Sequence, residues 1–493
     1  MLPDEEVQIK KERDSFFKVV KDHSLNDGLL IGCDKPFFKN FPNQNLTQNF
    51  FYIQIEKEKF VNFNKKYDLP STTYSELIER SPFQIYLFKD GNITGISDSS
   101  DIEKILTKKF DYIFFDIFDS PEIIHNILCM CFSLLKEGGI IGGRKYFDPK
   151  VPWMKIAIDN FFKRFNWIVH QEGTNIWWVQ EKSLNISFII PAYLCSNTIE
   201  EAITSIVETN FETNDEIIIV YDLSPDDLET KLFELKNKYP MIKLIKHLFP
   251  RGGGVARNIA VENSRNELIF CLDSDNILAP FTIQKLKQFL IDSGSDVAAF
   301  REIHYFNQKI SEITHKWQYK KGKISLADCL SGPIAPGASG NYLYTRNSWI
   351  SAGGYPEFSF LDTWGFGFRQ LATGSKMMVM ENLFYFHRHG HDSYWVRGSK
   401  TGTTSLQALQ IILPFLDLLD PLDVEYILSE EGRNTWYQDI NKHIINVKNH
   451  EKGQPGEVID DKSEVNKPNI MITIIKKTIS SVFLSLGYKI SKL

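Results

Sequence analysis

The sequence lacks the features that would place it in several familiar classes of protein. Its formal net charge is −6, which argues against a nucleic-acid binder that works through a general basic surface. It has no apolar run of 18 or more residues, so no transmembrane helix is expected. Residues 1–6 are acidic where a signal peptide would be basic and then apolar, so secretion is not expected.

Cysteine is also scarce, with 6 residues in a chain of 493. The cysteines are scattered and show neither a disulfide framework nor the spacing of a zinc site. Cys129 and Cys131 lie in a segment with helical periodicity, where they are expected to act as small core residues. Together with the missing signal peptide, this pattern predicts a cytoplasmic protein in a reducing compartment.

The remaining composition is that of an ordinary globular protein with several domains. Hydrophobic residues make up 43% and charged residues 24% of the chain, and 493 residues are too many for one core. Polar stretches and a restart of the strand pattern near residue 183 divide the sequence. The expected parts are a lead-in helix at 1–27, an α/β domain at 28–182, a second α/β domain at 183–400, a helical extension at 401–448, a flexible linker at 449–468 and a basic amphipathic helix at 469–493.

The first α/β domain has a predicted strand at 111–116, an amphipathic helix and a Gly-Gly turn at 138–139 before another strand. This order resembles the second half of a class I, S-adenosylmethionine-type methyltransferase, over residues 80–180. The resemblance implies the fold more than the activity, because the cofactor loop at 31–36 has one glycine and an early proline. We therefore expect a scaffold or docking domain that does not bind S-adenosylmethionine, with an active methyltransferase as the alternative.

The second α/β domain is organised around the apolar run 268–272, which ends at Asp273-Ser274-Asp275. Five consecutive apolar residues predict a strand buried on both faces, as in a parallel sheet. Ligands bind at the carboxyl ends of such strands, and two carboxylates one residue apart offer hard oxygen ligands to Mg²⁺ or Mn²⁺. The alternative is an Asp pair that only forms a turn.

Three more strands are predicted before this one, at 185–190, 216–220 and 242–245, each followed by a helix. Repeated β-α units imply a parallel sheet with right-handed crossovers and a nucleotide site along its carboxyl edge. The helix after the third strand opens on glycines 252–254, where backbone can approach a ligand closely and the helix N-terminus favours anions.

Four motifs in this order resemble a family-2 glycosyltransferase of the GT-A fold, over residues 185–400. The resemblance implies an α/β chain with two Rossmann-like domains and a C-terminal helical extension. It further implies a metal-dependent, inverting enzyme that moves a sugar from a nucleotide-sugar donor, with UDP-sugars favoured, to a glycan, glycolipid or glycoprotein. The motifs are Pro191-Ala192-Tyr193, Tyr221-Asp222-x-Ser224, Gly253-Gly254-x-Ala256-Arg257-Asn258 and Leu272-Asp273-Ser274-Asp275.

The resemblance assigns the donor site to side chains at the carboxyl edge. Asp275 is expected to bind Mn²⁺ or Mg²⁺, and Asp273 to face the ribose or a metal-bound water. Arg257 would reach a phosphate or the base edge, and Asp222 would contact the base or ribose. The alternatives are an exposed Arg257 on a helix that merely packs and a turn-capping Asp222. The remaining donor-binding candidates are Pro191, Ala192, Tyr193 and Gly254.

The acceptor half is expected beyond residue 297. Gly340 and Asn341 resemble the segment that lines the sugar and acceptor pocket, and Asp362 stands in the place of the family's acidic motif. Inverting transfer needs a base that takes the proton of the acceptor hydroxyl, so Asp362 is the catalytic candidate, with helix capping as the alternative. Trp364 offers a flat apolar face to a sugar ring or packs in the core.

A histidine-rich run at 387–391 supplies two more expected metal ligands, His389 and His391. Members of the family often carry a histidine here, and imidazole suits Mn²⁺ better than Mg²⁺. Surface histidines without a ligand are the alternative.

The segment 470–493 has the pattern of a basic amphipathic helix. It is expected to lie on an anionic membrane surface or to dock onto this protein or a partner helix. For the whole chain, a bifunctional glycosyltransferase and methyltransferase and a non-catalytic scaffold of glycan assembly are the rival functions. No nucleic-acid partner is expected.

Overall fold

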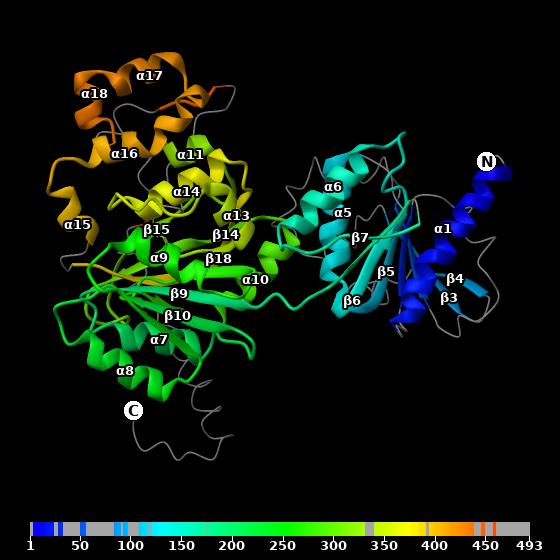
Figure 1. Cartoon of the computed structure of the whole chain (residues 1–493), viewed down its shortest axis with the longest axis horizontal. Helices are drawn as coiled ribbons and strands as arrows, with labels where there is room; N and C mark the ends of the chain where they lie inside the picture. Colours follow the sequence, from blue (N-terminus) through cyan, green and yellow to red (C-terminus); the bar gives the residue numbers. More distant parts are fainter. Residues whose placement is uncertain are drawn as a thin grey trace.

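The computed structural model of the chain contains two β-sheets with helices on their faces (Figure 1). Within the described residues, every helix is too short or too polar to span a lipid bilayer. The structure describes residues 3–23, 28–32, 50–55, 83–89, 92–96, 108–116, 120–173, 175–330, 340–390, 394–437, 445–448 and 457–459.

The N-terminal sheet has eight strands in the order β4-β3-β2-β1-β5-β6-β8-β7. Its centre, from β2 to β6, is parallel, as the alternation of strands and helices predicts. Antiparallel pairs form its two edges. The strands span Gly28–Gly32 (β1), Phe50–Ile55 (β2), Phe83–Lys89 (β3), Asn92–Ile96 (β4), Phe110–Asp116 (β5), Leu135–Gly143 (β6), His170–Glu172 (β7) and Ile176–Gln180 (β8).

Helices cover both faces of this sheet. Side chains point alternately to the two faces along each strand, so both faces carry apolar side chains that the helices bury. On one face, Phe16, Val19 and Val20 of α1 pack into a small core of strand side chains. On the other face α5 and α6 pack into the main core, and Cys129 and Cys131 are buried there as free thiols, as expected. These helices span Pro3–Asp22 (α1), Pro121–Ser133 (α5) and Trp153–Lys163 (α6).

The second sheet has eleven strands, with β11-β10-β9-β12-β17-β14-β15-β19 as its main path. The first four are parallel, and β12 is the predicted organising strand, with every residue buried. Beyond it the direction reverses at β17. The strands span Ile186–Ala192 (β9), Glu216–Tyr221 (β10), Ile242–Lys246 (β11), Leu268–Cys271 (β12), Ile277–Leu278 (β13), Val297–Phe306 (β14), Ile313–Gln318 (β15), Gly322–Ile324 (β16), Leu343–Thr345 (β17), Met377–Arg388 (β18) and Glu457–Ile459 (β19).

The helices of this half connect the strands and build a separate group over α14 (Figure 1). That group, from α16 to α18, has its own core around Trp364 and Trp436. It lies within the residues predicted to form the helical extension. The helices span Ile199–Val207 (α7), Leu228–Lys238 (α8), Gly253–Glu262 (α9), Thr282–Asp292 (α10), Leu326–Leu330 (α11), Arg346–Ala352 (α13), Asp362–Ala372 (α14), Tyr394–Ser399 (α15), Thr404–Ile412 (α16), Leu413–Leu418 (η2, a 3₁₀ helix), Pro421–Leu428 (α17) and Glu430–Thr435 (α18).

A short strand lies inside the stretch 449–468 that was predicted to be a flexible linker. Glu457–Ile459 form β19, which pairs antiparallel with the end of β15. For the rest of this stretch the flexible linker stays a prediction. The strand is too short to stand out in a polar stretch of sequence. The expected helix at 469–493 lies outside the described residues.

The two sheets meet where α5 and α6 contact the turn between α10 and β14. Arg164 Nη2 donates a hydrogen bond to the Ser295 carbonyl oxygen (2.8 Å), and Arg164 Nε lies 3.6 Å from Asp296 Oδ1. Gly294 in this turn, with φ +59°, lies against His125 of α5. Burial, helped by Arg164, lowers the pKa of His125 to about 3, so the imidazole is neutral. The contact joins both halves into one continuous core.

Candidate active site

The carboxyl edge of β12 carries Asp273, the first acid of the predicted pair. Its carboxylate accepts hydrogen bonds from Arg257 Nη2 (2.6 Å) and Asn341 Nδ2 (3.0 Å). Its backbone N–H donates to Asn341 Oδ1 (2.9 Å), so one amide holds Asp273 at two points. Asn341 is 1% exposed, which corrects the expectation that it faces the acceptor: it orients Asp273. Gly340 before it has φ +75°, a conformation that glycine adopts without strain.

Arg257 of α9 is the centre of this network. The second arm of its guanidinium, Nη1, donates to Asp362 Oδ2 (2.6 Å), and its Nε faces Cys271 Sγ (3.3 Å). Burial alone would lower the pKa of Arg257, but Asp362 and Asp273 raise it well above its ordinary value. The structure therefore rules out the exposed, merely packing arginine and makes Arg257 a buried bridge between two acids.

Asp362, the predicted catalytic acid, is the first residue of α14. It is buried, and burial raises its pKa while Arg257 opposes that rise. Its Oδ1 accepts the N–H of Thr363 (2.9 Å). Asp362 thus lies in the first turn of α14, but the N-cap position belongs to Leu361 and no side-chain capping bond is formed. Asp362 joins the site through Arg257.

Trp364, two residues further along α14, lies in the core. It is 1% exposed, and its ring contacts Phe368, Trp436 and Tyr437. This corrects the expectation of a sugar platform, because no face of the indole is open. Its position in α14 turns the ring towards the helical extension.

The glycines before α9 allow two chain segments to approach closely. A Cβ at Gly254 would lie 2.1 Å from the Pro356 carbonyl oxygen, and one at Gly253 would lie 2.7 Å from Asp362 Oδ2. The close approach at Gly254 is to Pro356 of the same chain, and the expected approach to a donor stays a prediction. It brings the start of α9 against the segment that leads to Asp362.

Asp222, at the end of β10, accepts three hydrogen bonds from the loop that leads into α9. The donors are the N–H groups of Arg251 (2.8 Å) and Gly252 (2.7 Å) and Nδ1 of His247 (2.6 Å). This is the turn-capping arrangement, and it gives Asp222 the role of shaping the glycine-rich loop. His247 was not predicted from the sequence, because its partner Asp222 lies 25 residues away.

The end of β9 and the residue that follows it are the other donor candidates. Ala192 is buried and Pro191 half-buried, whereas Tyr193 is 37% exposed. The Arg397 guanidinium lies over the Tyr193 ring, 5.8 Å from its centroid. Tyr193 is therefore the exposed aromatic residue among these three candidates.

Asp275, the expected metal ligand, lies half-buried on the turn after β12. Arg388 fixes this turn: its Nε donates to the Asp275 carbonyl oxygen (3.2 Å) and its backbone N–H donates to Asn276 Oδ1 (3.0 Å). The guanidinium also binds the Glu201 carboxylate on α7. Sequence reasoning missed Arg388, although it stands inside the histidine-rich run.

The side chain of His389 contacts residues outside the turn that carries Asp275. Its Nε2 is 2.7 Å from Thr314 Oγ1, and its ring centroid lies 5.4 Å from that of His315. His391 falls outside the described residues. Among those that are described, no group of three or more His, Cys, Asp or Glu side chains is arranged to hold a metal. The carboxylate of Asp275 fits a cation shared with a ligand's phosphates, which is how Mg²⁺ is usually bound, but not a cage made by protein alone.

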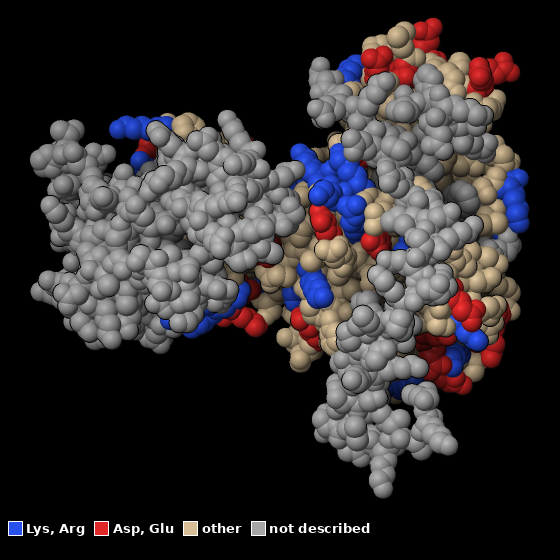
Figure 2. Space-filling model, turned by 180° about the vertical axis from the view of Figure 1, so that it is seen from behind, with Lys and Arg blue, Asp and Glu red and all other residues tan. Residues whose placement is uncertain are grey.

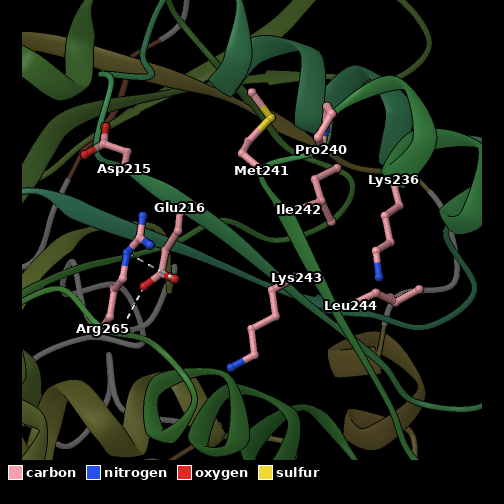
Figure 3. A pocket seen from close by; sticks show the side chains of 9 residues that line it. All are labelled: Asp215, Glu216, Lys236, Pro240, Met241, Ile242, Lys243, Leu244 and Arg265. Atoms are coloured by element: carbon pink, nitrogen blue, oxygen red, sulfur yellow. Dashed lines mark hydrogen bonds and ion pairs between the residues drawn. The ribbon is translucent and has the colours of Figure 1, made fainter.

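A hollow of about 460 Å³ lies at the opposite, amino end of the parallel strands (Figure 3). Its acids are already engaged: Asp215 accepts the Ile186 N–H (2.7 Å), and Glu216 faces Arg265. Burial raises the pKa of Asp215 to about 6. Because strands β10 and β11 begin here, this hollow is separate from the edge that carries Asp222 and Asp273.

The carboxyl edge of the N-terminal sheet contains an ion network. Arg144, after β6, donates from Nε to Asp116 Oδ1 (2.9 Å) and from Nη1 to Glu12 Oε2 (3.3 Å). All three side chains are nearly inaccessible to solvent. Arg144 is thus the partner of Asp116, the acid that ends β5. The resemblance of this part to a methyltransferase stays a prediction.

Comparison with known proteins finds a similarity in the second sheet. The model of the family described as Glycosyl transferase family 2 matches residues 187–351, about a third of the chain. This stretch is similar to glycosyl transferase family 2 domains. It contains Asp222, Arg257, Asp273 and Asp275, whereas Asp362 lies beyond its end.

Curated relatives match parts of the chain. Poly(ribitol-phosphate) beta-glucosyltransferase of Bacillus spizizenii is 31% identical over 116 residues, 23% of this chain and 18% of that protein. Poly(ribitol-phosphate) beta-N-acetylglucosaminyltransferase TarP of Staphylococcus aureus is 26% identical over 152 residues, 30% of this chain and 45% of that protein. The matches therefore span less than half of these relatives. A solved structure, S. aureus TarS 1-349 in complex with UDP-GlcNAc, has a TM-score of 0.41 and 18% identity, and the match covers 51% of this chain and 72% of that one.

Proposed function

We propose that residues 185–400 form a metal-dependent, inverting glycosyltransferase that moves a sugar from a UDP-sugar to a hydroxyl group of a glycan or glycolipid. The observation that carries this proposal is the Arg257 bridge. It joins Asp273, assigned to the donor from the D-x-D step, and Asp362, assigned to the base from a separate motif. The family match and the printed names of the relatives, which glycosylate a poly(ribitol-phosphate), support the reaction class.

On the donor side, Asp275 would hold Mn²⁺ or Mg²⁺ together with the donor's diphosphate. The cation supplies positive charge next to the leaving phosphate, where negative charge develops. The chain itself fixes the turn that carries Asp275, through Arg388 and its contact with Glu201. Tyr193 is suited to stack on the base, since its ring is 37% exposed next to the carboxyl end of β9.

On the acceptor side, Asp362 would take the proton from the attacking hydroxyl. A general base works best when its pKa lies nearer to the working pH than that of an ordinary aspartate. Burial moves the pKa of Asp362 in that direction, and Arg257 opposes this rise. Arg257 would thereby set both the position and the basicity of Asp362.

The test is a donor-binding and transfer assay on the full chain with a panel of nucleotide sugars, with and without Mn²⁺. We expect Asp275→Ala to lose metal-dependent donor binding, and Asp362→Ala to bind donor normally but to transfer no sugar. Equal donor affinity for Asp275→Ala and the unmodified protein would refute the metal assignment. Failure of every donor to bind or to release nucleoside diphosphate would leave the scaffold function in its place.

A further inference from the structure

The helical extension exposes a group of leucines that the described structure leaves uncovered. Leu422 on α17 is 76% exposed, although burying a leucine side chain away from water is energetically favourable. Exposed leucines on one small unit become more stable when a partner covers them, so these positions are candidates for a contact. We call this group the leucine surface: Leu406 (45% exposed), Leu413 (53%), Leu422 (76%) and Leu428 (44%).

The charges around the leucine surface have one predominant sign. Among the exposed side chains from η2 to α18, Asp417, Glu425, Glu430 and Glu431 are acidic and Arg433 is basic. None of the four acids forms an ion pair with another described residue. Acidic side chains gather over this unit at the top of the view in Figure 2. The surface therefore favours a partner that is both apolar and basic.

Residues 470–493 have these properties. The segment has four lysines and no acidic residue: Lys476, Lys477, Lys489 and Lys492. Its apolar residues Ile475, Ile479, Val482, Phe483 and Leu486 follow a helical spacing. An anionic membrane would match the lysines but would be repelled by the acids of the leucine surface.

Covalent linkage favours a partner within the same chain. The described chain ends at β19, and residues 460–469 that follow span at most about 35 Å when extended. A tethered segment meets its own molecule at an effective concentration of the order of millimolar. We propose that residues 470–493 dock onto the leucine surface of the same molecule, with lysines paired to the exposed acids. This contact is independent of the proposed transferase activity.

The test is hydrogen–deuterium exchange of the full chain. We expect the amides of 470–493 and α17 to be protected, and Leu422→Asp to speed the exchange of 470–493 at least tenfold. Phe233→Asp, a matched change at an exposed apolar residue of α8, should leave that exchange unchanged. Both substitutions are at exposed positions, and an unchanged melting temperature would show that each variant is folded.

A charge swap separates docking from a general loss of order. Glu425→Lys with Glu431→Lys should speed the exchange of 470–493, and adding Lys476→Glu with Lys477→Glu should restore protection. Unprotected amides in 470–493, or protection that none of these variants changes, would overturn the proposal. So would a dimer in sedimentation that Leu422→Asp dissociates, since the occupant would then be a second copy. A membrane would be the partner of 470–493 if two results were found together. The chain would bind vesicles containing phosphatidylglycerol only when Lys476 and Lys477 are present, and the amides of 470–493 would be unprotected when no vesicles are added.

Discussion

Asp273 and Asp362 bind the two arms of a single guanidinium. Arg257 Nη2 lies 2.6 Å from Asp273 Oδ1, and Arg257 Nη1 lies 2.6 Å from Asp362 Oδ2. One acid ends the central strand and the other begins α14, so three separate elements meet at this cation. The position of the base candidate therefore depends on the same side chain as the position of the donor-side acid.

The first prediction concerns the loss of this bridge. Arg257→Met should destabilise the fold by about 3–5 kcal/mol, because removing one member of a buried ion network leaves charges without a partner. Transfer should also be lost, since neither acid would keep its place. Urea denaturation measures the stability change, and Arg265→Met is the control, since Arg265 is exposed and lies 3.8 Å from Glu216. The control should change stability by less than about 1 kcal/mol. Equal effects of the two substitutions would contradict the buried bridge.

The second prediction is the pH dependence of transfer. Burial raises the pKa of Asp362 and Arg257 opposes this. Because the base must be ionised, kcat/KM should fall as the pH drops through a pKa above that of an ordinary aspartate. Steady-state rates between pH 4 and pH 8 measure this limb. Asp362→Glu should keep an acid limb at a changed pKa, whereas Asp362→Asn should be inactive at every pH. An active Asp362→Asn enzyme would remove Asp362 from the role of base.

The third prediction concerns the pH dependence of stability. Burial raises the pKa of Asp292 from 3.8 to about 6, so between these values the folded state binds the proton more tightly than the unfolded state does. Its contribution to stability is therefore greatest below about pH 4, falls as the pH rises to about 6 and is constant above that. The loss of stability between low and neutral pH that this carboxyl group causes is at most about 3 kcal/mol.

Asp292→Asn removes this titration. It should raise stability at pH 7 and flatten the pH profile between about pH 4 and pH 6, as followed by urea denaturation across that range. Asp227→Asn, at an exposed position that forms no capping bond, is the control and should change neither. A profile that is the same in Asp292→Asn and the unmodified chain would show that this carboxyl group does not titrate differently on folding.

The fold of the second sheet was predictable because its signals are local. An apolar run, a following D-x-D step and a glycine-rich helix start each occupy a few consecutive residues, and β12 and α9 appear where they predict. The contacts made by the site residues were not predictable in the same way. Asn341 holds Asp273 from 68 residues away, and Arg388 reaches the Asp275 carbonyl from 113 residues away. Periodicity cannot reveal pairs that only the folded sheet brings together.

The type of a residue alone was also a poor guide to its role where that role depends on burial. An aromatic ring two residues after a catalytic candidate suits a sugar platform, but Trp364 is turned inwards by the rotation of α14. For Asp222, the simpler alternative describes the observed bonds. The sequence alone does not show which side of a helix or turn faces solvent when the residues on either side of a position are apolar.

The fourth prediction tests the core role of Trp364. Trp364→Ala should destabilise the protein by about 3–5 kcal/mol, because it leaves a large cavity between α14 and the helical extension. Trp364→Phe should lose less stability and keep the acceptor KM within about twofold, which a sugar platform would not allow. Trp153→Ala, at an indole that is 37% exposed, is the control for removing a tryptophan. A large rise in acceptor KM for Trp364→Phe with unchanged stability would reverse this assignment.

The last prediction concerns the contact between the two sheets. A Cβ at Gly294 would lie 2.2 Å from His125 Nε2 and 2.5 Å from Cys129 Sγ, so Gly294→Ala must push α5 away from the turn that binds Arg164. Gly173→Ala is the matched control: its φ of +65° is close to the +59° of Gly294, but no atom lies within 4 Å of the added Cβ.

Both substitutions should lower the free energy of unfolding by about 1 kcal/mol, because alanine is strained in the left-handed conformation. Gly294→Ala should lower it by a further amount of about 1–3 kcal/mol because of overpacking. Calorimetry should therefore show a lower melting temperature for Gly294→Ala than for Gly173→Ala. If the contact is what makes the sheets unfold together, Gly294→Ala should also split one transition into two. Identical melting curves for the two variants would mean that the sheets do not rely on this turn for their association.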